Sequence, residues 1–367
     1  MLRGVMARAR NGAMFSQEVQ PMSSTPMPGS ADERPLVVLA DPIRPEEVPW
    51  WQMVVGEGQA RLVTPDKRED LAELARVSRD AVAIVCREGR IDRHVMKSAP
   101  RLRLIQKVGW AGNNVDMEAA KALGIRVDVC LNPLRIPVAE HAFLLMLALA
   151  KQLIPAHRAV DCGENPRQIA PFTTAERVYA YNWLGQTGLQ PLFRKTLGLV
   201  GLGEIGTSVA KRARAFDMEV LYFDLRRLPT EQEGALALRY ADFREVLRES
   251  DFVSLHIPYS QATHHLIGEA ELGLMKPSAF LINTCRGGVV DEKALAKALS
   301  QGRIAGAGLD VFEEEPLVGR HAFAGMPNVV LTPHIAAIRE ETMDNILPEI
   351  GRNVAWAIEQ DRCGAPR

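Results

Sequence analysis

The feature that most restricts the fold is a glycine pattern between a predicted strand and a predicted helix. The strand is expected at residues 197–200 and the helix at 205–216, with Gly201, Gly203 and Gly206 at the turn that joins them. In a dinucleotide-binding unit the first glycine permits a tight turn, the second lets the backbone approach a pyrophosphate, and the third lets helix and strand pack closely. The helix N-terminus then faces the phosphate charge. The pattern predicts a parallel α/β sheet that binds a dinucleotide.

The next predicted strand, at residues 219–223, leads to a carboxylate that bears on the choice of cofactor. Asp224 stands 18 residues after Gly206, close to the offset of about 20 residues at which an acid binds the ribose hydroxyls. A carboxylate there repels the additional phosphate of NADP, so NAD is the expected cofactor. Arg226 and Arg227 follow at once and would attract that phosphate, unless they only form a solvated turn. NADP is therefore the less favoured alternative.

Strand and helix patterns divide the chain into two α/β segments. Short apolar strands are expected at residues 35–40, 81–85, 102–108 and 125–129, and further βα units run from Thr196 to residue 330. We predict two Rossmann-like domains with doubly wound parallel sheets, the cofactor domain being inserted into a discontinuous substrate domain. The expected boundaries are 35–133 and 333–367 for the substrate domain and 134–332 for the NAD-binding domain.

The segments outside these units receive separate expectations. An apolar helix at 138–153 is long enough to reach from one domain to the next, and a helix at 340–358 is expected to pack back on the first domain. Residues 155–194 have weak periodicity and are interpreted as a long surface connection of unknown role. Residues 1–34 are basic at first and then rich in Met, Ser and Pro. They predict a disordered extension, with a targeting peptide as the alternative.

Composition and charge restrict the partners. The formal net charge is -1, which removes the electrostatic case for nucleic acid or an anionic membrane. The most apolar run, at 142–150, is shorter than the roughly 18 residues of a membrane span. Five cysteines, odd in number and far apart, form no CxxC pair for a metal. We expect a small-molecule substrate, no metal, and a reducing, cytoplasmic location.

Four ordered motifs resemble the D-isomer-specific 2-hydroxyacid dehydrogenase family. They lie at residues 197–224, at 275–291 with Asn-Thr-Cys-Arg-Gly-Gly-Val-Val-Asp, at 308–316 with Gly-Leu-Asp-Val-Phe-Glu-Glu-Glu-Pro, and at 331–335 with Leu-Thr-Pro-His-Ile. The similarity runs from Pro35 to the end of the chain, and four motifs in order are more specific than one glycine loop. The resemblance implies an NAD-dependent oxidoreductase that transfers a hydride between nicotinamide and C2 of a small D-2-hydroxy or 2-keto acid. It also implies a homodimer.

The resemblance implies three catalytic residues. Arg286 would bind the substrate carboxylate through its planar guanidinium and polarise the keto oxygen. His334 would be the general acid when the keto acid is reduced and the general base in the reverse reaction. Glu315 would orient His334 and favour its charged form. Taken singly, each of these residues is more often a surface or turn residue, and it is their joint occurrence in family order that favours catalysis.

Further residues would contact the cofactor. Beside the three glycines and Asp224, the resemblance implies cofactor binding by Glu204, Ile205, His256, Thr284, Cys285 and Asp310. Asp310 would lie on the nicotinamide side, Cys285 would occupy a small-residue position beside the carboxamide, and His256 would line the adenine site. Neither Asp310 nor Cys285 is expected to be a nucleophile. Glu140 and His141 also match the family and are expected to be architectural.

The segment at 107–116 resembles the family loop whose backbone amides bind the substrate carboxylate. Gly109, Trp110 and Ala111 are therefore expected near the substrate. The pattern departs from the family, in which two glycines are separated by one residue, because Ala111 stands at the second position and Gly112 follows it. Trp110 either shapes the pocket or belongs to the core.

The substrate and the direction of the reaction are left open by these residues. Glyoxylate and hydroxypyruvate reduction is favoured, and 3-phosphoglycerate dehydrogenation is the alternative. The latter is weakened because the sequence runs only 33 residues past His334, which leaves no room for an appended regulatory domain. An NADH-sensing corepressor with the same fold is the alternative of another class.

Overall fold

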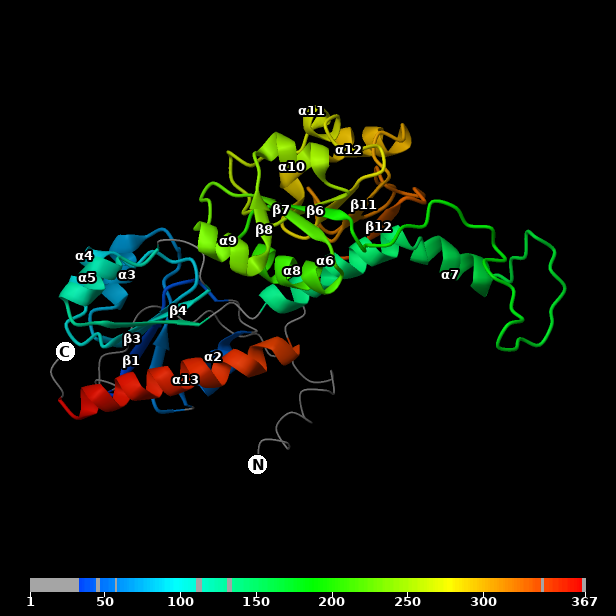
Figure 1. The fold of residues 1–367 in the computed structure, drawn as a ribbon. Helices are drawn as coiled ribbons and strands as arrows, with labels where there is room; N and C mark the ends of the chain where they lie inside the picture. The colour runs from blue at the N-terminus through cyan, green and yellow to red at the C-terminus, as the bar shows by residue number, and fades with distance from the viewer. Residues whose placement is uncertain are drawn as a thin grey trace. The chain divides into compact units, whose positions relative to one another are not determined.

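The computed structural model describes residues 33–43, 47–56, 58–109, 114–130, 134–337 and 340–364. Residues from Pro35 onward form a compact unit that contains two parallel sheets, of five and seven strands. Helices cover both faces of each sheet (Figure 1). The predicted fold class, two Rossmann-like units with doubly wound parallel sheets, is confirmed.

The first sheet has the strand order β2-β1-β3-β4-β5. Two of its central strands, β1 and β3, are continuous apolar runs, as expected of parallel strands buried on both faces. The strands are β1 (Leu36–Leu39), β2 (Arg61–Val63), β3 (Ala81–Cys86), β4 (Leu104–Val108) and β5 (Arg126–Cys130). The helices between them are α2 (Val48–Val55), α3 (Leu71–Val77), α4 (Arg93–Ser98) and α5 (Met117–Ala122).

The last helix of the chain, α13 (Glu340–Arg362), returns to this first sheet. It contacts β3, β4, β5 and α2, and Ile350 and Val354 are fully buried in the core that it shares with them. Asn353 donates a hydrogen bond to Oε1 of the buried Gln106 at 2.7 Å. The prediction that the C-terminal helix packs back on the first α/β segment is confirmed, and the helix ends four residues later than predicted.

The second sheet has the order β12-β11-β10-β9-β6-β7-β8. Its strands are β6 (Thr196–Val200), β7 (Glu219–Phe223), β8 (Leu238–Tyr240), β9 (Phe252–Leu255), β10 (Phe280–Asn283), β11 (Gly306–Leu309) and β12 (Val329–Leu331). The strand order reverses between the neighbours β6 and β9. In open α/β sheets a ligand binds outside the carboxyl ends of the strands at such a reversal.

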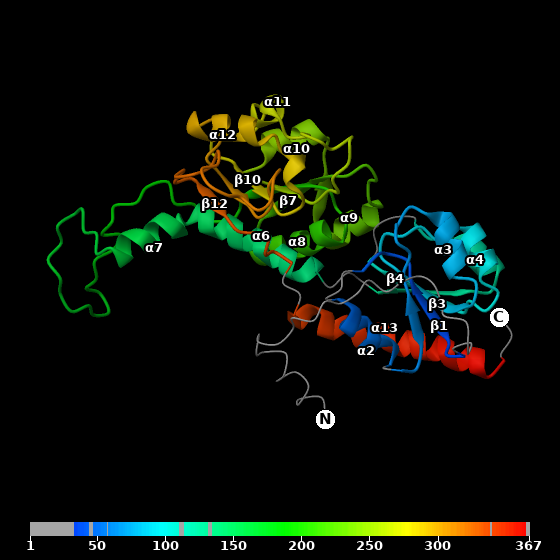
Figure 2. The ribbon, with the colours of Figure 1, turned by 180° about the vertical axis from the view of Figure 1, so that it is seen from behind.

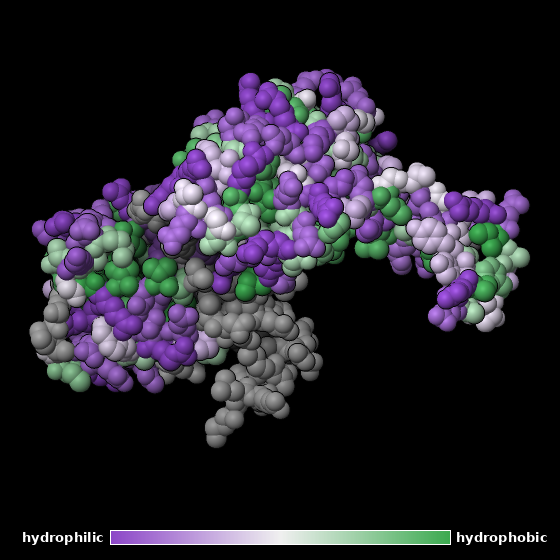
Figure 3. Space-filling view, in the orientation of Figure 1, coloured by the Kyte–Doolittle hydropathy of each residue, from purple (hydrophilic) through white to green (hydrophobic). Residues whose placement is uncertain are grey.

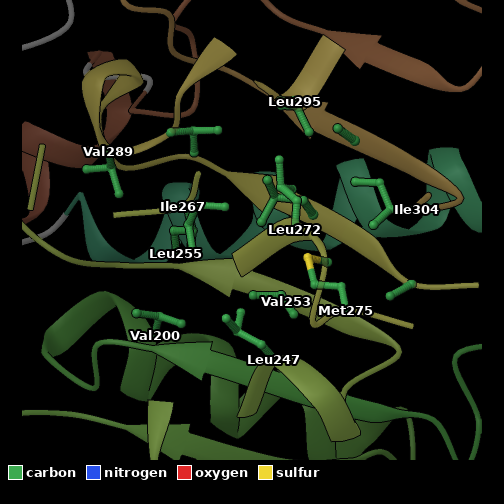
Figure 4. Packing of buried hydrophobic residues seen from close by; sticks show 14 of the residues in the cluster. Val200, Leu247, Val253, Leu255, Ile267, Leu272, Met275, Val289, Leu295 and Ile304 are labelled. Carbon is green, nitrogen blue, oxygen red and sulfur yellow. The ribbon is translucent and has the colours of Figure 1, made fainter. Parts of the chain in front are cut away.

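Two separate cores hold helices on the two faces of this sheet. One core, shown in Figure 4, packs Leu247, Leu272 and Leu295 against Val200 and Val253. The other core lies on the opposite face (Figures 1 and 2). The helices of the first face are α10 (Phe243–Glu249), α11 (Glu269–Leu272) and α12 (Glu292–Ser300); those of the second are α6 (Arg135–Ala150) and α8 (Glu204–Ala215), and α9 (Thr230–Leu236) contacts β8.

The segment after α6 differs from the prediction. A second helix, α7 (Leu153–Asp161), follows α6 at a bend of 61°, so the expected connection does not begin at Pro155. Proline is compatible with the first helical turn, where the backbone N–H groups have no acceptor within the helix, and Pro155 occupies its third position. Within the described ranges no single helix has the length and apolar composition of a membrane span; only α6 and α7 joined across the bend would meet both criteria.

Candidate active site

The predicted cofactor residues follow directly after strands of the second sheet. Gly201 follows β6, Asp224 follows β7, His256 follows β9, Thr284 follows β10 and Asp310 follows β11. The strands are parallel, so their carboxyl ends lie at one edge of the sheet. The fold thus brings five residues from a 110-residue stretch to the edge at which ligands bind in this class of sheet.

The three glycines of the turn between β6 and α8 are present for two different reasons. Two are required by the packing of the protein itself, and one leaves space for a ligand. Gly201 has φ +94°, and a Cβ there would stand 2.5 Å from the carbonyl oxygen of His256. A Cβ at Gly206 would stand 2.3 Å from the carbonyl oxygen of Gly201. Nothing lies within 4 Å of a Cβ built on Gly203. The protein itself therefore requires the first and third glycines, whereas the second leaves an open space at the start of α8.

That open space fits a pyrophosphate. Glu204 and Ile205 are the first residues of α8, whose N-cap is Gly203, and the positive end of the helix dipole attracts phosphate. Asp224 lies beside the turn, because one of its carboxylate oxygens accepts a hydrogen bond from the backbone N–H of Leu202 at 2.7 Å and the other accepts from Arg226 at 3.0 Å. Each oxygen retains a lone pair for a ribose hydroxyl.

Two side chains at this edge carry buried polar atoms without a hydrogen-bond partner among the described residues. They are His256, through Nδ1, and Thr284, through Oγ1. His256 Nε2 lies 2.9 Å from Oγ of Ser254, and burial lowers the pKa of His256 to about 3, so the imidazole is neutral. A buried polar atom left unpaired is a costly feature that a bound ligand relieves.

The neighbouring Cys285 is buried as well. Its Sγ lies 3.1 Å from Oδ1 of Asn283. Burial raises the pKa of the thiol above 9.0, and a protonated thiol is a poor nucleophile. The side chain therefore acts as a small packed group beside Arg286.

Arg286 and the segment at 312–315 are held together by a glycine. The Arg286 guanidinium is exposed, and its Nη1 donates to the carbonyl oxygen of Cys285 at 2.6 Å. A Cβ at Gly287 would stand 1.8 Å from the carbonyl carbon of Phe312. Only glycine therefore permits this approach, which places the Arg286 charge close enough to help lower the pKa of Glu315.

His334 and Glu315 form a close pair. The Nδ1 atom of His334 lies 2.6 Å from Oε2 of Glu315, whose Oε1 accepts a hydrogen bond from the backbone N–H of Phe312 at 2.9 Å. Burial raises the pKa of Glu315, but the hydrogen bonds with His334 and Phe312 lower it by more, so the net pKa falls below 4.5. His334 has φ +55°, a left-handed conformation that non-glycine residues adopt only when the surroundings hold them there.

The surroundings that hold His334 centre on Asp310. This carboxylate is fully buried, accepts hydrogen bonds from the backbone N–H groups of Ile335 at 2.9 Å and Ala336 at 2.8 Å, and accepts a third from Oγ1 of Thr332 at 2.6 Å. It thereby fixes the backbone on both sides of His334. His141 joins the network through Nε2, which lies 2.8 Å from Oγ1 of Thr332, in agreement with the architectural role expected of it.

The predicted substrate loop lies mostly outside the described residues. Gly109 is described, has φ +88° and donates its backbone N–H to the carbonyl oxygen of Cys130 at 2.8 Å. Trp110 and Ala111 are not among the described residues.

Two residues of the site could not be predicted from the sequence. Thr332 was missed because a threonine directly before a proline carries no signal of its own. The role of Glu313 was also missed: its carboxylate accepts a hydrogen bond from the backbone N–H of Glu292 at the start of α12.

Comparisons with known proteins agree with this arrangement. Residues 143–336 match the family model described as D-isomer specific 2-hydroxyacid dehydrogenase, NAD binding domain. A glyoxylate reductase of Thermococcus litoralis is 42% identical over 265 residues, which cover 72% of this chain and 76% of the relative.

Solved structures extend the similarity to the whole fold. A glyoxylate reductase from Paecilomyes thermophila has 30% identity and a TM-score of 0.60, with 89% of this chain and 96% of that chain covered. A D-lactate dehydrogenase from Aquifex aeolicus, complexed with NAD and lactic acid, has 29% identity and a TM-score of 0.56, with 90% and 97% covered. The family match and the glycine turn identify NAD as the cofactor. The chain belongs to the D-isomer-specific 2-hydroxyacid dehydrogenases, oxidoreductases that act on the CH–OH group of 2-hydroxy acids.

Proposed function

We propose that this dehydrogenase reduces glyoxylate to glycolate, with hydroxypyruvate as a second substrate. The observation that carries the proposal is the pair of His334 and Glu315, 2.6 Å apart, beside the cationic Arg286. Curated relatives that are about 40% identical bear the name glyoxylate reductase, which supports the small keto acid as the substrate.

Arg286 is proposed to bind the carboxylate of the substrate. Its guanidinium is exposed and presents several N–H donors in one plane, of which the contact with Cys285 uses one. Such a fork holds a carboxylate at two points and fixes the orientation of the keto group. The same charge stabilises negative charge that develops on the keto oxygen.

His334 is proposed to protonate that oxygen. NADH, when bound at the glycine turn, would supply the hydride for C2 of the keto acid. The oxygen then requires a proton, and the imidazolium is the acid. Because Nδ1 of His334 is held by Glu315, Nε2 is the nitrogen that remains for the substrate. Glu315 keeps the ring in this orientation.

The domain boundaries remain part of this proposal. We assign residues 35–133 and 333–367 to the substrate domain and 134–332 to the NAD-binding domain, because α13 packs on the first sheet while β12 completes the second. We also propose that Gly109, Trp110 and Ala111 contact the substrate. Gly109 follows the carboxyl end of β4, the kind of position from which such sheets bind ligands.

We propose that the enzyme is a homodimer that uses the surface of α7 and the loop after it. No residue of α7 is buried, and apolar and hydrophilic patches alternate over this segment (Figure 3). An exposed apolar surface of this extent is typical of an interface. The exposed apolar residues are Leu153, Ile154, Val160, Phe172, Val178, Tyr179, Tyr181, Trp183 and Leu189.

A cytoplasmic location is supported by the five cysteines, all of them unpaired.

The proposed function is tested by NADH oxidation with glyoxylate, hydroxypyruvate, pyruvate, phenylpyruvate and 3-phosphohydroxypyruvate. Glyoxylate should be turned over with the highest kcat/KM, and His334→Gln should abolish turnover while NADH still binds. His94→Gln is the matched control, since His94 is an exposed histidine of α4. Binding of NADH without turnover of any of these acids would refute the proposal.

A further inference from the structure

The loop after β7 contains an ion pair that bears on the choice between NAD and NADP. The Arg227 guanidinium binds the Glu233 carboxylate at two points, with Nε 2.9 Å from Oε1 and Nη2 3.0 Å from Oε2. The guanidinium also stacks over the Tyr240 ring, 5.1 Å from its centroid. Such a two-point contact fixes the orientation of the guanidinium and occupies its Nε/Nη2 edge.

Glu233 is held in place from its other side. The fully buried Tyr222 donates its hydroxyl to Oε1 of Glu233 at 2.7 Å and accepts a hydrogen bond from the backbone N–H of Leu228 at 2.9 Å. Burial and the contact with Glu233 raise the pKa of Tyr222 to about 12. The hydrogen bonds from Arg227 and Tyr222 lower the pKa of Glu233, so Glu233 stays an anion and Tyr222 stays a donor.

This cluster lies next to the residue that binds the adenosine ribose. Asp224 precedes Arg227 by three positions and is tied to the glycine turn through Leu202. NADP differs from NAD by a phosphate on that ribose, and an arginine beside the acid is the group that accommodates it. A guanidinium whose Nε and Nη2 bind a carboxylate is held in one orientation, so its remaining N–H groups cannot turn toward a phosphate unless that pair is released.

We propose that Glu233, held by Tyr222, is a coenzyme-specificity residue that keeps Arg227 away from the ribose phosphate of NADP. Discrimination at this site then has two parts. Asp224 repels the phosphate, and Glu233 holds Arg227, one of the two arginines that would otherwise compensate for the repulsion. The inference rests on the cofactor site at Gly203 and Asp224 that the proposed function also uses.

The test measures binding without any substrate. Dissociation constants of NADH and NADPH are obtained from nicotinamide fluorescence for the wild type and for Glu233→Gln, which keeps the shape of the side chain and removes its charge. The ratio Kd(NADPH)/Kd(NADH) should fall about tenfold in Glu233→Gln, equivalent to about 1.4 kcal/mol. Glu231→Gln, an exposed position on the same helix, is the matched control and should leave the ratio unchanged.

A double variant identifies the source of the change. Glu233→Gln combined with Arg227→Ala should return the ratio to the wild-type value, because the released cation is then absent. A ratio that does not move in Glu233→Gln, or that stays lowered in the double variant, would overturn the inference. If Glu233→Gln does not fold, Tyr222→Phe provides the test. This variant removes the Tyr222 hydroxyl, one of the two groups that hold Glu233, and should lower the ratio Kd(NADPH)/Kd(NADH) by a smaller factor.

Failure of the proposed function is distinguishable from failure of this inference. A wild type that binds NADH but does not reduce glyoxylate contradicts the substrate assignment and leaves the binding ratio measurable. A wild type that binds neither nucleotide contradicts the cofactor site itself and overturns the inference with it.

Discussion

The imidazole of His334 and the carboxylate of Glu315 meet with Nδ1 and Oε2 2.6 Å apart, although 19 positions separate them in the sequence. The second oxygen of Glu315 is held by the backbone N–H of Phe312. The carboxylate is therefore positioned by the main chain, and in turn it orients the ring. This relationship makes the acid-base behaviour of the site depend on a residue that need not touch the substrate.

Replacing Glu315 by Gln should lower kcat for glyoxylate reduction by roughly tenfold or more. The amide keeps the shape of the side chain but lacks the negative charge that strengthens the hydrogen bond with Nδ1 of His334, so the ring is less firmly oriented for proton transfer. The measurement is made beside that of Glu314→Gln, an exposed neighbour. An identical kcat in Glu315→Gln and wild type would remove Glu315 from the catalytic pair.

The stability of the enzyme should depend on pH through His256. Its pKa is lowered from 6.5 to about 3 by burial. Between these two pH values the histidine is therefore protonated in the unfolded chain and neutral in the folded chain. The resulting stability is complete above pH 6.5 and is lost as the pH falls toward 3, by up to about 1.4 kcal/mol per pH unit.

His256→Gln cannot take up a proton and should show a flatter decline of the urea midpoint between pH 7 and pH 5. The exposed His94→Gln serves as the control and should keep the wild-type slope. Equal slopes in all three proteins would contradict the neutral state of His256 in the folded chain.

Gly203→Ala should fold normally and bind NADH at least tenfold more weakly. A Cβ at this position meets no protein atom within 4 Å, yet it would occupy the space that the pyrophosphate requires. Fluorescence titration with NADH and thermal unfolding separate the two effects. Gly234→Ala, where a Cβ is equally unobstructed, is the control. Wild-type affinity in Gly203→Ala would place the pyrophosphate elsewhere.

Arg286→Lys should raise KM for glyoxylate and lower kcat together. Lysine keeps the charge but replaces a planar fork by a single ammonium group, so the carboxylate is less well oriented in both the ground state and the transition state. We expect kcat/KM to fall by roughly two orders of magnitude, with NADH affinity preserved. Steady-state kinetics at saturating NADH measure both parameters, and wild-type values would exclude Arg286 from the substrate site.

Local patterns were sufficient to predict the sheets and the glycine turn. Parallel strands buried on both faces give continuous apolar runs, as at Ala81–Cys86. The turn is determined by three glycines that lie within six consecutive positions. The end of the long helix was harder to predict. Pro155 suggested an interruption, but α7 begins two residues before it and places the proline in its first turn. The break lies instead at Gln152, which has a left-handed conformation.

Contacts between distant segments could not be predicted from the residues alone. The partners of Asp310 are two backbone N–H groups and the hydroxyl of Thr332, more than 20 positions away. Backbone groups are the same in every residue, so no sequence pattern indicates that they will bind this carboxylate. The pairing of Arg227 with Glu233 was hidden for a related reason, since an arginine in a turn reads equally well as a solvated cation.

Asp310→Asn should lower kcat for glyoxylate reduction by at least tenfold while the Kd of NADH stays within about twofold of the wild type. The amide nitrogen cannot accept the hydrogen bonds of Ile335 or Ala336, and each lost bond to a charged acceptor costs roughly 1.5–3 kcal/mol. His334 would then no longer be held at φ +55°, and its ring would be displaced from Glu315.

If Asp310 instead contacts the nicotinamide directly, as the family resemblance implies, Asp310→Asn should mainly weaken NADH binding and should change kcat less. Asp251→Asn provides the control, because Asp251 accepts the backbone N–H of Thr196 at 2.9 Å at the start of β6, the amino end of the same sheet. That variant should lose stability without a loss of kcat. A loss of kcat in Asp251→Asn equal to that in Asp310→Asn would show that the effect is general destabilisation, because the two carboxylates share only their role as acceptors for backbone N–H groups.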